Sequence, residues 1–238
     1  MKHIFTYKQT EYFDIKNMSV IGDFNNWDET VNIMKKNEEG IWWNEVELSS
    51  GEHLYKFIIN DNIRMNDPIA NLYALNKEGE LMSLIIINEN DERLYNNEQY
   101  TVHIEKYNML NQILEEDLQI NKKYFNINID EKVVTKFEFT NVTGVHAITV
   151  LWYKPDNTLH SFSENILFTP DGEEDKPITM WFWIELNTEF LLMGMWSIKL
   201  FVDGEFILED GFNIGNSPTY TSTKQKHNTQ NNGFEEWC

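Results

Sequence analysis

The sequence predicts an all-β protein, with two immunoglobulin-like β-sandwich domains in tandem joined by a short, partly helical connector. Short runs of β-branched and aromatic residues alternate with turns rich in Gly, Asn and Asp along most of the chain. The 238 residues include 15 Phe, 10 Tyr and 8 Trp, a density of aromatic side chains that is typical of β-sheets. Since 41% of the residues are apolar, the chain can bury a sizeable core.

The first domain is predicted to span residues 1–88. We expect its strands at residues 3–7, 18–21, 41–48, 53–60 and 82–87, with polar or Gly-containing turns between them. In strand 41–48, a period of two places Trp42 toward the core and Trp43 outward beside two carboxylates. Strand 82–87 alternates little at its end, which indicates that both of its faces are covered, by the second domain among other candidates.

The connector and the second domain follow. Residues 89–121 are predicted to connect the domains, with a strand at 100–104 and one helical face running from Leu110 to Leu118. Residues 122–215 contain about seven short strands and predict a second β-sandwich, whose sequence resembles no family that we recognise. Residues 216–238 are polar and are expected to be disordered.

The net charge and the cysteine count limit which binding partners and which cellular compartment the sequence predicts. The formal net charge of −20 repels nucleic acid and anionic membranes, whereas a neutral polysaccharide is indifferent to it. Cys238 is the single cysteine, so an intrachain disulfide is impossible and nothing indicates an oxidising compartment. With no apolar run long enough for a signal peptide or a membrane span, the sequence predicts a cytoplasmic protein.

Four blocks in the first domain carry a resemblance to a known family. They are Gly22-Asp23-Phe24-Asn25-Asn26-Trp27, Gly40-Ile41-Trp42, Gly51-Glu52-His53-Leu54-Tyr55-Lys56-Phe57 and Asp67-Pro68. In order and spacing, roughly residues 3–88 resemble the family 48 carbohydrate-binding modules. That family includes the glycogen-binding domain of the AMP-activated protein kinase beta subunit and the N-terminal modules of branching enzymes and isoamylases. The resemblance implies an immunoglobulin-like sandwich that binds α-glucan.

The resemblance also implies particular site residues. Trp27 matches the tryptophan that stacks on a glucose ring in the family, and Lys56 matches a lysine that hydrogen-bonds sugar hydroxyls. Arg64 stands where the kinase-type modules have a second stacking tryptophan; a guanidinium can stack and donate but is a different platform. The family's late binding loop falls near residues 79–83, where Leu81 offers an apolar contact and Ser83 a hydroxyl. About half of the sugar site is therefore present.

Enzymatic chemistry has little support in the sequence. It contains no Gly-rich phosphate loop, no Gly-x-Ser-x-Gly elbow and no His-Glu-x-x-His motif. The histidines lack metal-ligand spacing, so no metal and no cofactor are expected. The catalytic barrel that usually follows this module needs about 250 residues, which the chain does not provide.

Three hypotheses remain open at this point. The first is a non-catalytic, intracellular α-glucan-binding protein centred on Trp27 and Lys56. The second is a regulatory or scaffold protein with a vestigial sugar site, whose partner docks on outward Trp43 or on the face carrying Trp181 and Trp183. The third, a small glycan-active enzyme, has the least support.

Overall fold

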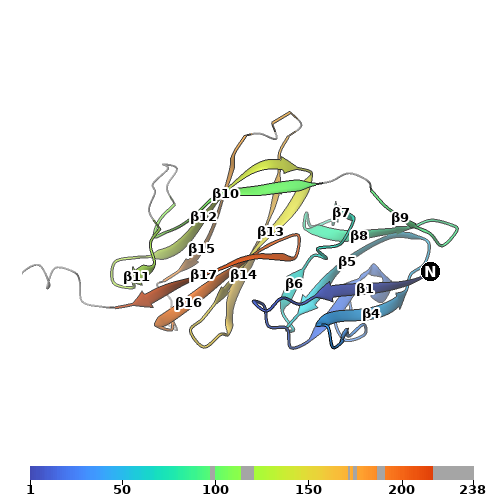
Figure 1. The fold of residues 1–238 in the computed structure, drawn as a ribbon, viewed down its shortest axis with the longest axis horizontal. Helices are drawn as coiled ribbons and strands as arrows, with labels where there is room; N and C mark the ends of the chain where they lie inside the picture. Colours follow the sequence, from blue (N-terminus) through green and yellow to red (C-terminus); the bar gives the residue numbers. More distant parts are fainter. Residues whose placement is uncertain (97–99, 114–120, 171, 174–175, 187–190, 217–238) are drawn as a thin grey trace, which may run out of the picture.

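The computed structural model describes residues 1–96, 100–113, 121–170, 172–173, 176–186 and 191–216. The described residues form two all-β sandwiches that lie side by side (Figure 1). We call strands β1 to β9 the first sandwich and strands β10 to β17 the second sandwich. Among the described residues, no helix is long and apolar enough to cross a membrane.

The first sandwich is built from two sheets and a short 3-10 turn, η1 (Asp23–Asn25). One sheet has the order β1-β4-β3, and the other has the order β2-β5-β8-β7, with β6 beside β5 and β9 beside β8. The strands are β1 (Lys2–Lys8), β2 (Met18–Gly22), β3 (Lys35–Lys36), β4 (Ile41–Glu47), β5 (Gly51–Ile59), β6 (Ile63–Met65), β7 (Leu72–Leu75), β8 (Leu81–Ile87) and β9 (Arg93–Leu94).

Alternation along β4 and β5 fills the space between these two sheets. Trp42 is buried, and its neighbour Trp43 is exposed on the other face of β4, as the period of two predicts. Phe5, Tyr55 and Phe57 pack edge to face within the same core. Strand β8 is buried on both faces over nearly its whole length, which confirms the expectation for residues 82–87.

The second sandwich also has two sheets, of orders β10-β12-β15 and β11-β17-β16-β13-β14. Trp152, Trp196 and Phe212 pack against one another in its core. The strands are β10 (Thr101–Leu110), β11 (Tyr124–Asn126), β12 (Lys132–Thr143), β13 (Val145–Tyr153), β14 (Leu159–Phe168), β15 (Ile178–Glu185), β16 (Gly194–Val202) and β17 (Glu205–Gly215).

The predicted connector differs in part from the structure. The strand expected at 100–104 extends to Leu110 as β10, and it pairs with β12 over its length. Leu110, expected on a helical face, is therefore a strand residue, because its backbone groups bond to a neighbouring strand far along the chain. The rest of the expected helix falls mainly on residues 114–120, and the expected disordered tail on residues 217–238; both lie outside the described residues.

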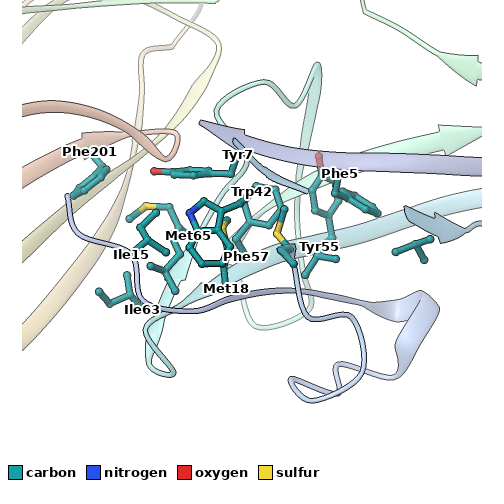
Figure 2. Packing of buried hydrophobic residues seen from close by; sticks show 14 of the residues in the cluster. Phe5, Tyr7, Ile15, Met18, Trp42, Tyr55, Phe57, Ile63, Met65 and Phe201 are labelled. Carbon is teal, nitrogen blue, oxygen red and sulfur yellow. The ribbon is translucent and has the colours of Figure 1, made fainter. Parts of the chain in front are cut away.

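The two sandwiches share an apolar interface. Leu151 and Phe201 of the second sandwich belong to the buried cluster of the first, and Figure 2 shows Phe201 beside Tyr7 and Ile15. Phe13 meets Phe201 edge to face, with ring centroids 5.0 Å apart. The five-stranded sheet of the second sandwich therefore covers part of the first.

Candidate functional site

A cavity of about 880 Å³ opens on the first sandwich and brings three of the predicted site residues together. Its floor is the outer face of the β2-β5-β8 sheet, where Ile21, Lys56 and Met82 lie. Trp27 lines it from the turn after β2, and residues 75–78 and 80 of the β7–β8 hairpin line it from another side. The cavity combines an aromatic ring, apolar side chains and charged hydrogen-bonding groups, a combination that suits a ligand with both apolar faces and polar groups.

Trp27 is held in the left-handed region of backbone conformation. Its φ is 62°, and the preceding Asn26 has a φ of 56°. A bulky residue rarely adopts such an angle, so the surrounding contacts must enforce it. The Trp27 amide donates to the Gly22 carbonyl oxygen at 2.9 Å, which closes the turn. The indole remains 40% exposed and is available for stacking.

Asn25 and Gly22 are the local reasons why the turn has this shape. The Asn25 side-chain amide donates to the Val20 carbonyl oxygen at 3.0 Å and to Asn32 Oδ1 at 2.9 Å, while its Oδ1 accepts from the Gly22 amide. A Cβ at Gly22 would lie 2.5 Å from the Phe24 ring and 2.6 Å from the Leu54 carbonyl oxygen. The Gly-Asp-Phe-Asn-Asn-Trp block is thus a structural device for presenting Trp27.

Lys56 lies on the floor of the cavity, yet its ammonium group donates a hydrogen bond to the second sandwich. The residue is only 4% exposed, and its Nζ donates to Glu164 Oε1 at 2.7 Å. Glu164 lies on β14, and its Oε2 accepts from the Thr149 hydroxyl at 3.3 Å. A buried ammonium requires such a counter-charge, so the pair fixes the position of Lys56.

The other residues predicted to bind sugar fall into two groups, one lining the cavity and one buried. Arg64 lines the cavity, is largely exposed, and has its guanidinium 3.5 Å from Glu29 Oε1. Leu81 and Ser83 are buried, and it is Met82 between them that lines the cavity. The Ser83 hydroxyl accepts from the Asp67 amide at 2.8 Å, so it serves the Asp-Pro turn.

Trp43 lies on the other sheet of the first sandwich. It is 38% exposed on β4, and its cross-strand neighbours are Thr6 on β1 and Lys35 on β3. Residues of the β2-β5-β8-β7 sheet line the cavity around Trp27, so Trp27 and Trp43 lie on different surfaces of the first sandwich.

Sequence reasoning missed two contributors to this site. The first is the part of the β7–β8 hairpin that precedes Gly79, in which Asn76 Oδ1 accepts from the amides of Glu78 and Glu80. Its signal in the sequence was an Asn three residues before Gly79, a turn pattern. The second is Glu164, which lies 108 residues from Lys56 and leaves no local signal. In the described part of the chain, no cluster of three or more His, Cys, Asp or Glu side chains could hold a metal ion.

Residues 5–93 match the family model described as the glycogen recognition site of AMP-activated protein kinase. The match spans the whole cavity lining, from Ile21 to Met82, and the first sandwich from the middle of β1 to the start of β9. The first sandwich is thus similar to a glycogen-recognition module, which supports glucan binding. No curated protein matches the chain.

Two solved structures are among those similar to part of the chain. An immunoglobulin-like protein from Pseudomonas aeruginosa is 17% identical, and the similarity covers 48% of this chain and 97% of that one at a TM-score of 0.35. A β-glucosidase from Listeria innocua, in complex with isofagomine, is 10% identical at a TM-score of 0.32. This second similarity covers 52% of the chain but only 17% of the glucosidase, and neither similarity carries a conclusion about activity.

Proposed function

We propose that the chain is a non-catalytic α-glucan-binding protein whose cavity around Trp27 receives a glycogen- or starch-like chain. The observation that carries the proposal is the convergence of Trp27, Lys56 and Arg64 on one cavity. A glucan offers apolar C–H faces to a ring and hydroxyls to charged donors, and the cavity supplies both kinds of group. The match to a glycogen-recognition model over residues 5–93 supports the same reading.

We also propose that the protein acts in the cytoplasm and needs no cofactor. Its single cysteine suits a reducing compartment, since no intrachain disulfide is possible. An uncharged ligand suits a chain of net charge −20, because glucan binding does not depend on attraction between opposite charges.

The test is retention on glycogen in affinity electrophoresis, with titration of maltoheptaose to measure affinity. Trp27→Ala should weaken binding about tenfold or more, because the loss of a stacked indole removes both contact area and ring geometry. Trp43→Ala is the matched control: an equally exposed tryptophan on the other sheet, whose loss should change affinity less than twofold. Cellohexaose tests the preference for α-linked glucose.

A wild-type protein that runs freely through glycogen-containing gels, and that binds no maltoheptaose, would contradict the proposal. The second candidate function would then gain support, namely a regulatory or scaffold protein in which this fold docks a partner protein. The hydrogen bond from Lys56 to Glu164 favours that alternative, since it uses one N–H donor of the ammonium inside the molecule. Recovery of one stoichiometric partner, lost on Trp43→Ala or Trp183→Ala, would be its test.

A further inference from the structure

We propose that the second sandwich completes the glucan site, with Phe162 on β14 as the aromatic contact that the first sandwich lacks at Arg64. This inference rests on the proposed function and names a further binding residue for the same site.

Phe162 and Glu164 lie on the same face of β14. In the antiparallel pairing with β13, Phe162 is opposite Leu151 and Glu164 is opposite Thr149, so both side chains are on the face of Leu151 and Thr149. Leu151 belongs to the buried cluster of the first sandwich. The face that carries Phe162 is therefore the one turned toward the first sandwich.

The path of β14 is fixed at two points. At its start, Leu159 lines a cavity shared with Ile63, which is on β6 of the first sandwich. Further along, Glu164 receives the hydrogen bond from Lys56 on β5. Phe162 lies between these two contacts along β14.

The residues of the β5–β6 hairpin in the first sandwich follow the same order as their contacts along β14. In the β5–β6 hairpin, Ile63 pairs with Ile59 and Arg64 pairs with Ile58, which is two residues beyond Lys56. The Ile58–Arg64 pair thus lies between the two contact points, as Phe162 does on β14. We infer that Phe162 faces the Arg64 side of the cavity.

The Phe162 ring is free enough to bind a ligand. The residue is 39% exposed, close to the exposure of Trp27, although its strand packs against the first sandwich. A phenyl ring at the rim can contact the apolar face of a glucose unit, while the guanidinium of Arg64 donates to hydroxyls.

Lys56 keeps donors for the same site. An ammonium has three N–H donors, and the hydrogen bond to Glu164 uses one of those on Lys56.

The experiment uses the full chain and measures maltoheptaose affinity by titration calorimetry. Phe162→Ala should weaken binding about fivefold, the effect of losing one aromatic contact, and Phe162→Tyr should retain the affinity of the wild type. Phe168→Ala is the matched control, since Phe168 lies on the same face of β14, is 58% exposed and is six residues away. Its loss should change affinity less than twofold.

A second measurement separates contact from a structural effect. In protein labelled with 4-fluorophenylalanine, the ¹⁹F resonance that disappears in Phe162→Tyr should shift when maltoheptaose saturates the wild type. The resonance assigned in the same way with Phe168→Tyr should not shift. Unfolding temperatures of all variants would show whether any loss of affinity follows a loss of structure.

The outcomes distinguish this inference from the proposed function. If the wild type does not bind glucan, the proposed function fails. If the wild type binds, Trp27→Ala abolishes binding, and Phe162→Ala behaves as Phe168→Ala does, the glucan site stands but the part assigned to the second sandwich is overturned. A loss confined to Phe162→Ala, with a shifted ¹⁹F resonance at that residue, supports a site built from both sandwiches.

Discussion

Asp67 is a carboxyl group held almost entirely out of water in the turn after β6. The Tyr55 hydroxyl donates to its Oδ2 at 2.8 Å, and the Ile69 amide donates to its Oδ1 at 2.9 Å. Burial raises the pKa of Asp67 from 3.8 to about 6, because desolvation of the charged form outweighs these hydrogen bonds and the charge of Arg93. The ionised carboxylate therefore destabilises the fold at neutral pH.

Asp67→Asn should remove one contribution to the pH dependence of the free energy of unfolding. Between pH 3.8 and about pH 6 the folded state binds the proton and the unfolded state releases it, so the free energy of unfolding falls as pH rises. The full difference amounts to about 3 kcal/mol above pH 6. The amide can still accept from Ile69 and bond to Tyr55, so the variant should be the more stable protein at pH 7.

The measurement is urea denaturation of both proteins at several pH values from 4 to 7. A slope that is identical in Asp67→Asn and in the wild type over this range would contradict the assignment.

His146 affects the stability over a different pH range. Burial opposes protonation of the imidazole, but Asp203 and the carbonyl oxygens of Thr143 and Thr101 outweigh burial, so the pKa of His146 is raised from 6.5. The stability that it contributes is present below pH 6.5 and is lost as pH rises through the folded-state pKa, in both proteins.

The hairpin of β16 and β17 shows how a single element locks the two sandwiches together. Its Asp203-Gly204 turn points toward the first sandwich (Figure 1), and the Tyr7 hydroxyl donates to the Gly204 carbonyl oxygen at 3.1 Å. Gly204 has a φ of +90°, and a Cβ there would lie 2.0 Å from the Asn66 carbonyl oxygen. The hairpin thus requires glycine both for its turn and for the close approach of the two backbones.

Gly204→Ala should destabilise the protein by about 3 kcal/mol or more, since it adds a backbone clash to the strain of a positive φ. Gly40→Ala is the matched control: its φ is +79°, and a Cβ there would meet no atom within 4 Å. That variant should lose only about 1–2 kcal/mol, the cost of the left-handed conformation alone. Urea denaturation measures both, and equal losses would refute the close packing of the hairpin against Asn66.

At the scale of the whole molecule, the interface makes the two sandwiches one cooperative unit. Leu151 and Phe201 are fully buried in the cluster of the first sandwich, and Tyr12 stacks on Phe206 with ring centroids 5.3 Å apart. Apolar burial of this kind, rather than the Lys56–Glu164 pair, supplies the stabilisation, because a buried ion pair roughly offsets its own desolvation.

Phe201→Ala should therefore destabilise the whole chain by about 3–5 kcal/mol, the usual cost of removing a buried phenyl ring. We expect one unfolding transition in the wild type, coincident by tryptophan fluorescence and by circular dichroism. The control Phe168→Ala removes an exposed ring and should change stability by less than about 0.5 kcal/mol. Two separate transitions in the wild type would contradict cooperative docking of the sandwiches.

The sequence by itself determined the fold class, most of the strands and the Trp27 turn. Period-two alternation in strand 41–48 separated Trp42 from Trp43, because successive side chains of a strand point to opposite faces. The turn is likewise local, since Gly22, Asn25 and Trp27 bond to one another or to near neighbours. Five strands of two to four residues, β3, β6, β7, β9 and β11, escaped prediction because so short a run carries no period.

Only the tertiary structure decided which contacts are made by the residues that the sequence predicts to bind sugar. Alternation predicts the face on which Lys56 lies but not what covers that face, and Glu164, which meets it, lies 108 residues away. Ser83 and Leu81 face the interior because the Asp67 turn and the core need them there. Contacts between distant segments depend on how two sheets pack, and packing depends on the shapes of whole faces rather than on any local pattern.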